Sequence, residues 1–135
     1  MVTLIGSLDS FSDTQYFART DWTTVPNFPG VYVIFDRGET IYVGMAGRNG
    51  QGGVRNRLRD HASGQIVNMF AQYLFLARVQ QLHEPRITHP RHAKDACRKY
   101  IAEHCAFRYK IVESAAEART LENSLKRTLS PSLNP

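Results

Sequence analysis

The chain has 135 residues, a formal net charge of +5 and two cysteines. This length fits one domain with its own hydrophobic core, and two cysteines do not make a disulfide framework. No apolar run is long enough to span a bilayer, and the N-terminus lacks a basic stretch followed by an apolar segment. We therefore expect a cytoplasmic protein without a membrane partner, and the positive charge favours an anionic ligand.

The first 29 residues are the least regular part of the sequence. The polar residues 12–14 could cap a short helix over residues 15–19. Prolines at positions 26 and 29 then bias the chain toward extended conformations. We treat residues 1–29 as an N-terminal extension, followed by one domain over residues 30–134.

Residues 30–44 read as a β-hairpin. Gly-Val-Tyr-Val-Ile-Phe is β-branched and aromatic, Asp-Arg-Gly-Glu supplies turn residues, and Thr-Ile-Tyr-Val-Gly forms the return strand. Gly38 is free to take a positive φ in the turn. A hairpin folds Tyr32 and Tyr42 toward each other, so two phenols are expected at one end of the sheet. Tyrosine is also an ordinary strand former, so the hairpin alone assigns them no function.

A glycine-rich loop and a helix follow the hairpin. Four of the nine residues in 45–53 are glycine, which predicts an exposed loop, and no Lys-Ser/Thr pair ends it as in a phosphate-binding loop. Residues 54–61 then read as a helix. Arg57 and His61 are i and i+4 neighbours on it, so their side chains can converge on one spot.

The second half of the chain contains three helical segments and one strand. Residues 65–81 read as a buried helix, with a strand over 73–79 as the alternative. Residues 92–104 read as an amphipathic helix, and 105–112 alternate as a third strand. A capping box at Ser114–Glu117 begins the last helix, which extends to about Leu129 and has Glu122 at the border of its apolar stripe. We therefore predict an α/β (α+β) domain with a small three-stranded, largely antiparallel sheet flanked by helices.

A set of residues, taken in order, resembles the signature of the GIY-YIG nuclease family. Residues 30–32 read Gly-Val-Tyr and residues 42–44 read Tyr-Val-Gly, so each tripeptide differs from the family's only by valine for isoleucine. The remaining matches lie on the first helix, on a later helix and near the C-terminus, in a Leu-Glu…Pro-Ser-Leu-Asn setting. The matching residues are Tyr32, Tyr42, Arg57, His61, Glu122 and Asn134. The resemblance covers residues 30–134.

The resemblance implies hydrolysis of a nucleic-acid phosphodiester with one divalent metal ion and no small-molecule cofactor. Glu122 would hold the ion, Mg²⁺ or Mn²⁺, because one carboxylate suits a hard cation that keeps most of its waters. Arg57 would stabilise charge on the phosphate with its planar guanidinium. Asn134, a neutral donor, would tie the C-terminus to the active-site end of the sheet.

The attacking water needs a base, and the resemblance points to the tyrosines. A phenol is a poor base near neutrality unless its anion is stabilised. We favour Tyr32 as the base, with Tyr42 holding a water or the phosphate, and the reverse assignment stays open. His61 would accept the phenol proton or orient the phenol.

The sequence departs from the family at two places. A lysine often follows the second tripeptide, and here that residue is Met45. Arg48 or Arg55 could replace the lysine. In addition, residues 63–104 read as a helical insertion between the first helix and the third strand, where substrate recognition could lie.

A basic cluster marks this insertion. Its members are Arg86, Arg91, His92, Lys94, Arg98 and Lys99. They form either a solvated surface or a contact with a DNA backbone, and we retain Arg86, Arg91 and Lys94, with Arg48 and Arg55, as candidate nucleic-acid-binding residues. The histidines and cysteines nearby lack the paired spacing of a zinc site, so we expect none.

These observations predict a metal-dependent endonuclease whose partner is nucleic acid, DNA rather than RNA. The alternative is a nucleic-acid-binding module that keeps the fold and lacks catalysis, and Met45 is the position that favours it. The sequence leaves the oligomeric state open.

Overall fold

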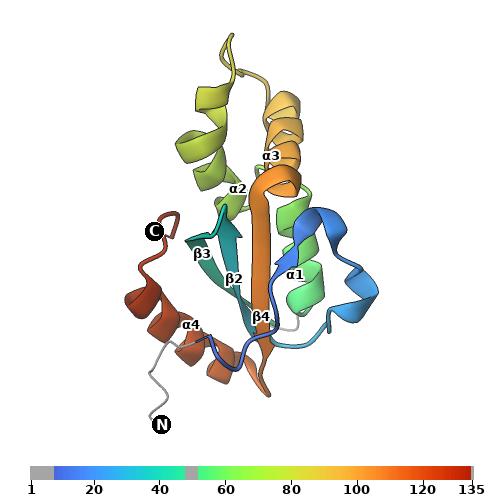
Figure 1. Cartoon of the computed structure of the whole chain (residues 1–135), viewed down its shortest axis with the longest axis vertical. Helices are drawn as coiled ribbons and strands as arrows, with labels where there is room; N and C mark the ends of the chain where they lie inside the picture. Colours follow the sequence, from blue (N-terminus) through green and yellow to red (C-terminus); the bar gives the residue numbers. More distant parts are fainter. Residues whose placement is uncertain (1–7, 48–51, 135) are drawn as a thin grey trace.

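The computed structural model describes residues 8–47 and 52–134 of the chain. Its centre is one antiparallel sheet of four strands (Figure 1). In spatial order the strands are β1 (Gln15–Tyr16), β4 (Cys105–Ile111), β2 (Gly30–Asp36) and β3 (Glu39–Ala46). The predicted antiparallel sheet flanked by helices is confirmed. The prediction of three strands is wrong, because the N-terminal segment adds a short fourth strand.

Where a short helix over residues 15–19 was predicted, residues 15–16 form a strand and residues 17–19 form a 3-10 helix. The two residues of β1 pair with Ala106 and Phe107 near the start of β4, and two short 3-10 helices follow. These are η1 (Phe17–Arg19) and η2 (Trp22–Thr24). They place the rings of Phe17 and Trp22 with centroids 4.9 and 5.7 Å from that of Phe107 on β4. Burial of this aromatic group outweighs a local capping signal, because it is a tertiary contact with a distant strand.

The hairpin of β2 and β3 is confirmed. Arg37 and Gly38 form its turn with φ values of 52° and 86°, as a two-residue turn that matches the strand twist requires. The register pairs Tyr32 with Gly44 and Ile34 with Tyr42. Since alternate residues of a strand share a face, both tyrosines project from the same side of the sheet.

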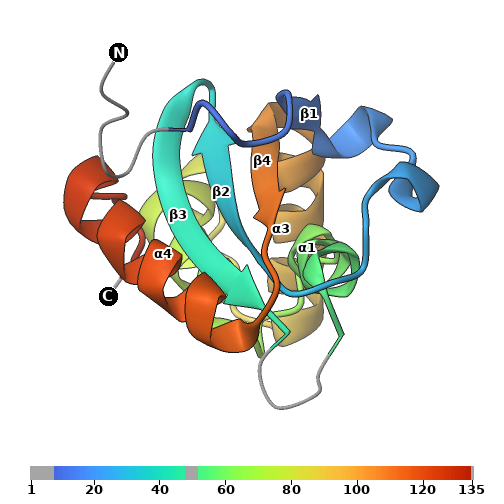
Figure 2. The ribbon, with the colours of Figure 1, turned by 90° about the horizontal axis from the view of Figure 1, so that it is seen from below.

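Helices cover both faces of the sheet (Figure 2). Three helices pack on the face that carries the two tyrosines, and one packs on the opposite face. The three are α1 (Val54–Ala62), α2 (Met69–Leu74) and α3 (Pro90–His104), and the fourth is α4 (Ala115–Leu129). No helix within residues 8–47 and 52–134 combines the length and apolarity needed to cross a membrane.

The predicted buried helix over residues 65–81 is helical, but it begins at Met69. Asn68 ends the preceding loop, because its side chain accepts a hydrogen bond from the amide of Ala71 at 2.8 Å. The helix continues beyond α2 as a π-helix, η4 (Phe75–Val79), and a 3-10 helix, η5 (Gln80–Leu82). The alternative strand over 73–79 is therefore wrong.

The last helix begins at the predicted capping box. The Ser114 hydroxyl accepts a hydrogen bond from the Glu117 amide at 3.2 Å. The Glu117 carboxylate in turn accepts from the Glu113 amide, also at 3.2 Å. Leu125 is fully buried and packs with valines of β2 and β3. This packing fixes the rotation of α4 about its axis and so the direction of its polar side.

The C-terminal segment closes the free edge of β3. The Leu133 amide donates to the Ile41 carbonyl at 2.8 Å. The side chain of Asn134 accepts from the Val43 amide at 2.8 Å and donates to the Val43 carbonyl at 2.9 Å. These bonds occupy backbone groups that an edge strand would otherwise leave unpaired, and they hold the strand segment that contains Tyr42.

A buried carboxylate stabilises the other end of the hairpin. Asp36 is 1% exposed, and one of its oxygens accepts hydrogen bonds from the Tyr100 hydroxyl at 2.5 Å and from Arg78 at 3.0 Å. Arg78 lies in η4 and also contacts Glu39 at 2.6 Å. The network therefore joins the helical segment between α1 and β4 to the turn of the hairpin.

Tyr100→Phe should destabilise the fold by about 1–3 kcal/mol, because it removes a hydrogen bond to a buried carboxylate that already has one unpaired oxygen. The measurement is the free energy of unfolding in urea. Tyr16→Phe is the matched control, since Tyr16 is 56% exposed. Equal stabilities of the two variants would contradict a stabilising role of the Asp36 network.

Candidate active site

A cleft lies at the end of the hairpin away from its turn, between α1 and α4. Its volume is about 370 Å³. Four of the predicted catalytic side chains line it, and they come from β2, β3, α1 and α4. They are Tyr32, Tyr42, Arg57 and Glu122. Because β3 is an edge strand, α4 reaches the cleft past that edge although it packs on the opposite face of the sheet.

Both tripeptide glycines are required by close packing. A β-carbon on Gly44 would overlap the phenol oxygen of Tyr32, which lies directly against this residue. A β-carbon on Gly30 would overlap the Lys110 carbonyl of β4 and the Val54 side chain of α1. Gly44 therefore leaves room for the phenol at the cleft, and Gly30 lets α1 approach the sheet.

His61 lies behind Tyr32, away from solvent. Its Nε2 atom is 2.7 Å from the Tyr32 hydroxyl, and this hydrogen bond is buried. The imidazole packs between aromatic rings, with centroids 5.7 Å from Tyr42 and 5.0 Å from Phe70. The bond fixes the orientation of the phenol whichever nitrogen of the neutral ring carries the proton.

Burial determines the charge of this pair. Desolvation, with a smaller contribution from the charge of Arg57, lowers the pKa of His61 from 6.5 to about 3. The Asn68 side chain opposes this shift, although no hydrogen bond of standard geometry joins it to the His61 Nδ1 atom. His61 is therefore neutral near pH 7, and it orients the phenol better than it could accept a proton.

The tyrosines are also held in their neutral forms. Desolvation is the main cause that raises the pKa of Tyr32 far above its ordinary value, with a further contribution from Tyr42. Burial likewise raises the pKa of Tyr42. The positive charge of Arg57 opposes both shifts and is the nearby group that favours a phenolate. A tyrosine in this cleft can thus act as a base only when more positive charge is present.

The residues of the cleft fit one hard divalent cation. The Glu122 carboxylate is 15% exposed and forms an ion pair with the Lys126 ammonium, 3.6 Å away. Asp60 also lines the cleft. No group of three or more metal-binding side chains occurs in the described part of the chain, so a bound ion would keep several waters, as Mg²⁺ prefers.

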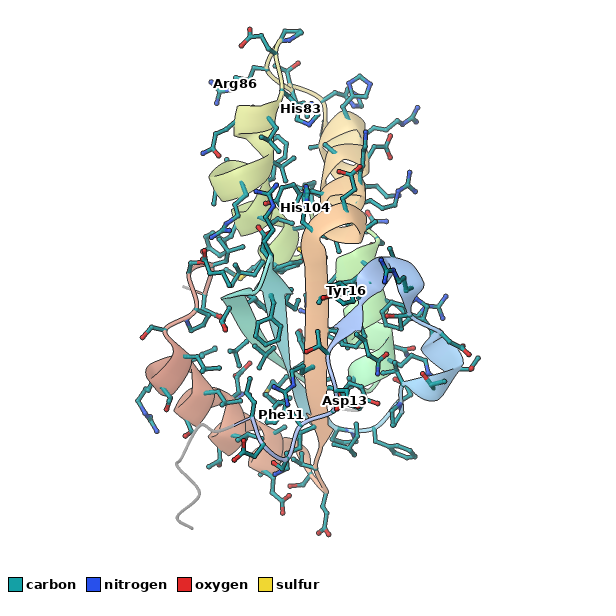
Figure 3. The ribbon with its side chains drawn as sticks, in the orientation of Figure 1. Phe11, Asp13, Tyr16, His83, Arg86 and His104 are labelled. Carbon is teal, nitrogen blue, oxygen red and sulfur yellow. The ribbon has the colours of Figure 1, made fainter. Side chains whose placement is uncertain are left out.

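Several predicted residues lie elsewhere. Asn134 binds the backbone of β3 next to Tyr42 and does not line the cleft. Arg55 donates to the Val25 carbonyl at 2.7 Å, which attaches α1 to the N-terminal segment. The basic cluster lies on and before α3, and Figure 3 shows Arg86 at the far tip of the molecule. Arg86, Arg91 and Lys94 are absent from the cleft lining, and Arg48 lies outside the described residues.

The sequence reasoning missed other residues of the cleft. Arg119 and Lys126 line it from α4, and Asp60 does so from α1. Arg119, Glu122 and Lys126 are related as i, i+3 and i+7, which places them on one side of a helix. A helical wheel drawn with Glu122 as its reference would have identified both cations.

The comparisons with known proteins find similarity among solved structures. No protein-family model and no curated protein matches the chain. Among solved structures, it is similar to the GIY-YIG N-terminal endonuclease domain of UvrC from Thermotoga maritima bound to its catalytic divalent cation, magnesium. The identity is 23% and the TM-score 0.48, over 90% of this chain and 99% of that one.

Two point mutants of the same Thermotoga maritima domain, each with a tyrosine replaced by phenylalanine, are also similar and contain the catalytic divalent cation. Their identities are 24% and 23%, their TM-scores are both 0.48, and 90% of this chain matches 98% of theirs. Similarity at this level concerns the backbone. The assignment of function therefore depends on the side chains of the cleft.

Acidification should destabilise the protein through His61. The folded state holds this pKa at about 3 and the unfolded state at 6.5, so between these two pH values mainly the unfolded chain binds the proton. The free energy of unfolding should fall by about 1.4 kcal/mol per pH unit between about pH 6 and about pH 4 from this residue. His61→Gln should lose that dependence, whereas His92→Gln, on the exposed surface of α3, should retain it. Unfolding in urea at several pH values measures the difference, and parallel curves for wild type and His61→Gln would contradict it.

Proposed function

We propose that this chain is a GIY-YIG-type endonuclease that hydrolyses phosphodiester bonds of nucleic acid, with DNA as its substrate. The observation that supports this most is the meeting of Tyr32, Tyr42, Arg57 and Glu122 in one cleft. Each is the residue type that the family resemblance assigns to that place. Their chemistry is that of phosphoryl transfer, in which a protein positions the phosphate and stabilises its charge.

Arg57 is the group that binds the scissile phosphate. Its side chain lies close enough to Tyr32 and Tyr42 for its charge to oppose the rise in the pKa of both phenols. A guanidinium stays protonated at all relevant pH values and offers two parallel donors to phosphate oxygens. Arg57 therefore stabilises the additional negative charge that develops on the phosphorus oxygens during attack.

Glu122 is the proposed metal ligand. A divalent cation bound there would act as a Lewis acid toward the phosphate and the leaving oxygen. Its charge would also add to that of Arg57 in favouring the phenolate form of a nearby tyrosine. Mg²⁺ or Mn²⁺, one ion per site, suits a carboxylate in a polar cleft of this kind.

Tyr32 is the proposed general base. Its oxygen reaches the cleft beside Gly44 while its ring is buried, and His61 holds the phenol in one orientation. The oxygen can accept a proton from a water in the cleft when the surrounding positive charge compensates the anion. Tyr42 lies next to it, with ring centroids 6.5 Å apart, and holds the water or a phosphate oxygen.

The proposed substrate follows from charge. Among the described residues, the lining contains three cations against two carboxylates, and the chain as a whole has a net charge of +5. An anionic polymer is the partner that such a cleft attracts. Both cysteines are free and buried, which suits a reducing compartment, so we place the enzyme in the cytoplasm.

Wild-type protein should nick supercoiled plasmid DNA when Mg²⁺ is present and should stop when EDTA is added. Glu122→Gln and Arg57→Ala should each reduce the rate by at least about 100-fold, because each removes a charge that acts on the transition state. Glu103→Gln on α3 and Arg127→Ala on α4, which change exposed residues outside the cleft, are the controls.

Nicking that survives either active-site substitution would contradict the catalytic role of the residue replaced. Salt-sensitive DNA binding by the wild type, without cleavage in Mg²⁺ or Mn²⁺, would instead favour a binding module with the same fold.

The cleavage rate should rise with pH, by up to about tenfold per unit between about pH 6 and about pH 9. The reason is that burial raises the pKa of Tyr32, so the phenolate fraction grows throughout this range. Tyr32→Phe should lose most of the rate and the dependence on pH. Tyr109→Phe is the control, since Tyr109 pairs with Tyr32 on the neighbouring strand and does not line the cleft. A rate profile of Tyr32→Phe parallel to that of the wild type would exclude Tyr32 as the base.

A further inference from the structure

The carboxylate of Glu122 already has a cationic neighbour on its own helix. Lys126 lies one turn later on α4, and its ammonium is 3.6 Å from the carboxylate. Both side chains line the cleft. A glutamate four residues before a lysine is the favourable order for such a pair. The pair is therefore part of the active cleft.

The contact is an ion pair without a tight hydrogen bond. Its 3.6 Å separation exceeds the usual 2.7–3.2 Å of an N–H···O bond. The Lys126 side chain is 35% exposed, which leaves its ammonium in contact with solvent. No second carboxylate in the described part of the chain lies within 4 Å of this ammonium. Lys126 can thus move to a new anion without breaking a tight hydrogen bond to Glu122.

Lys126 and Arg57 occupy opposite walls of the same cleft. Arg57 comes from α1 on the tyrosine face, and Lys126 comes from α4. Among the described residues, the ion pair that Glu122 forms within 4 Å is the one with Lys126. A phosphate between the two walls would have a guanidinium on one side and an ammonium on the other.

We propose that Lys126 is a substrate-binding residue with two alternative partners. In the metal-free protein it is paired with Glu122 and competes with a divalent cation for the carboxylate. When Glu122 binds the cation, Lys126 is released and donates to a phosphate oxygen of the nucleic acid, opposite Arg57. This inference rests on the proposed function, since it takes Glu122 as the metal ligand and nucleic acid as the substrate.

The first test measures metal binding without nucleic acid. The full chain is titrated with Mn²⁺, and free Mn²⁺ is followed by electron paramagnetic resonance. Lys126→Met removes the competing charge and should tighten Mn²⁺ binding about two- to fivefold, the range expected for the loss of one weak ion pair. Lys126→Arg should bind Mn²⁺ as the wild type does, and Glu122→Gln should lose this site.

The matched control is Arg127→Met. Arg127 is the next residue on α4, is exposed, and does not line the cleft. It removes the same unit of charge, so any effect of net charge alone would appear equally in both variants. An equal change in Mn²⁺ affinity for Lys126→Met and Arg127→Met would overturn the inference, as would weaker binding by Lys126→Met or no Mn²⁺ site in the wild type.

The second test measures binding of a DNA duplex by fluorescence anisotropy. In EDTA, Lys126→Met and Arg127→Met should bind DNA equally, because Lys126 is still paired with Glu122. In Ca²⁺, which probes the loaded site without Mg²⁺ or Mn²⁺, Lys126→Met should bind DNA about five- to tenfold more weakly than Arg127→Met. The salt dependence of DNA binding by Lys126→Met should correspond to about one phosphate contact fewer. Equal affinities in Ca²⁺ would overturn the second half of the inference.

These readouts separate the inference from the proposed function. If the wild type binds Mn²⁺ through Glu122 and shows the Ca²⁺-dependent role of Lys126 but cleaves no nucleic acid, the nuclease assignment fails and the inference about Lys126 stands. If the wild type nicks DNA and Lys126→Met shows neither effect, the assignment stands and the inference fails.

Discussion

The arrangement of the cleft depends on one buried hydrogen bond, between the Tyr32 hydroxyl and Nε2 of His61. It joins the central strand β2 to α1 through two side chains that are almost fully buried, so loss of either partner would leave a polar group without its bond. Because His61 and Arg57 are one helical turn apart, the same bond sets the rotation of α1 that directs Arg57 into the cleft. The same hydrogen bond therefore stabilises the fold and positions two of the proposed catalytic residues.

Glu122 lines the same cleft from a helix on the other face of the sheet. Its helix packs on the opposite face of the sheet, and only the position of β3 at the edge allows α4 to contribute to the cleft. The bonds of Asn134 to Val43 hold that edge, one residue from Tyr42. Asn134 thus has a positioning role beside the cleft, as a neutral donor and acceptor suits, and it is not among the groups that would touch a phosphate.

Local patterns in the sequence predicted most elements, because hairpin turn residues, a capping box and helical periodicity act over a few residues. The turn at Arg37 and Gly38 and the cap at Ser114 are examples. The fourth strand was missed because residues 15–16 become a strand only by pairing with β4. Lys126 was missed for a different reason, because its signal lies in its spacing of one helical turn from Glu122 and shows only when that residue is taken as the reference of the helix.

The sequence by itself therefore determined the types of the main elements and the order of Tyr32, Tyr42, Arg57 and Glu122 along the chain. The tertiary structure alone decided that these four side chains share one space and that His61 is neutral. It also decided that Arg55 bonds to the N-terminal segment, whereas Lys126 lines the cleft. The physical reason is that burial, pKa and charge pairing depend on neighbours contributed by distant segments, whereas hydrogen bonds within a turn or a helix are local.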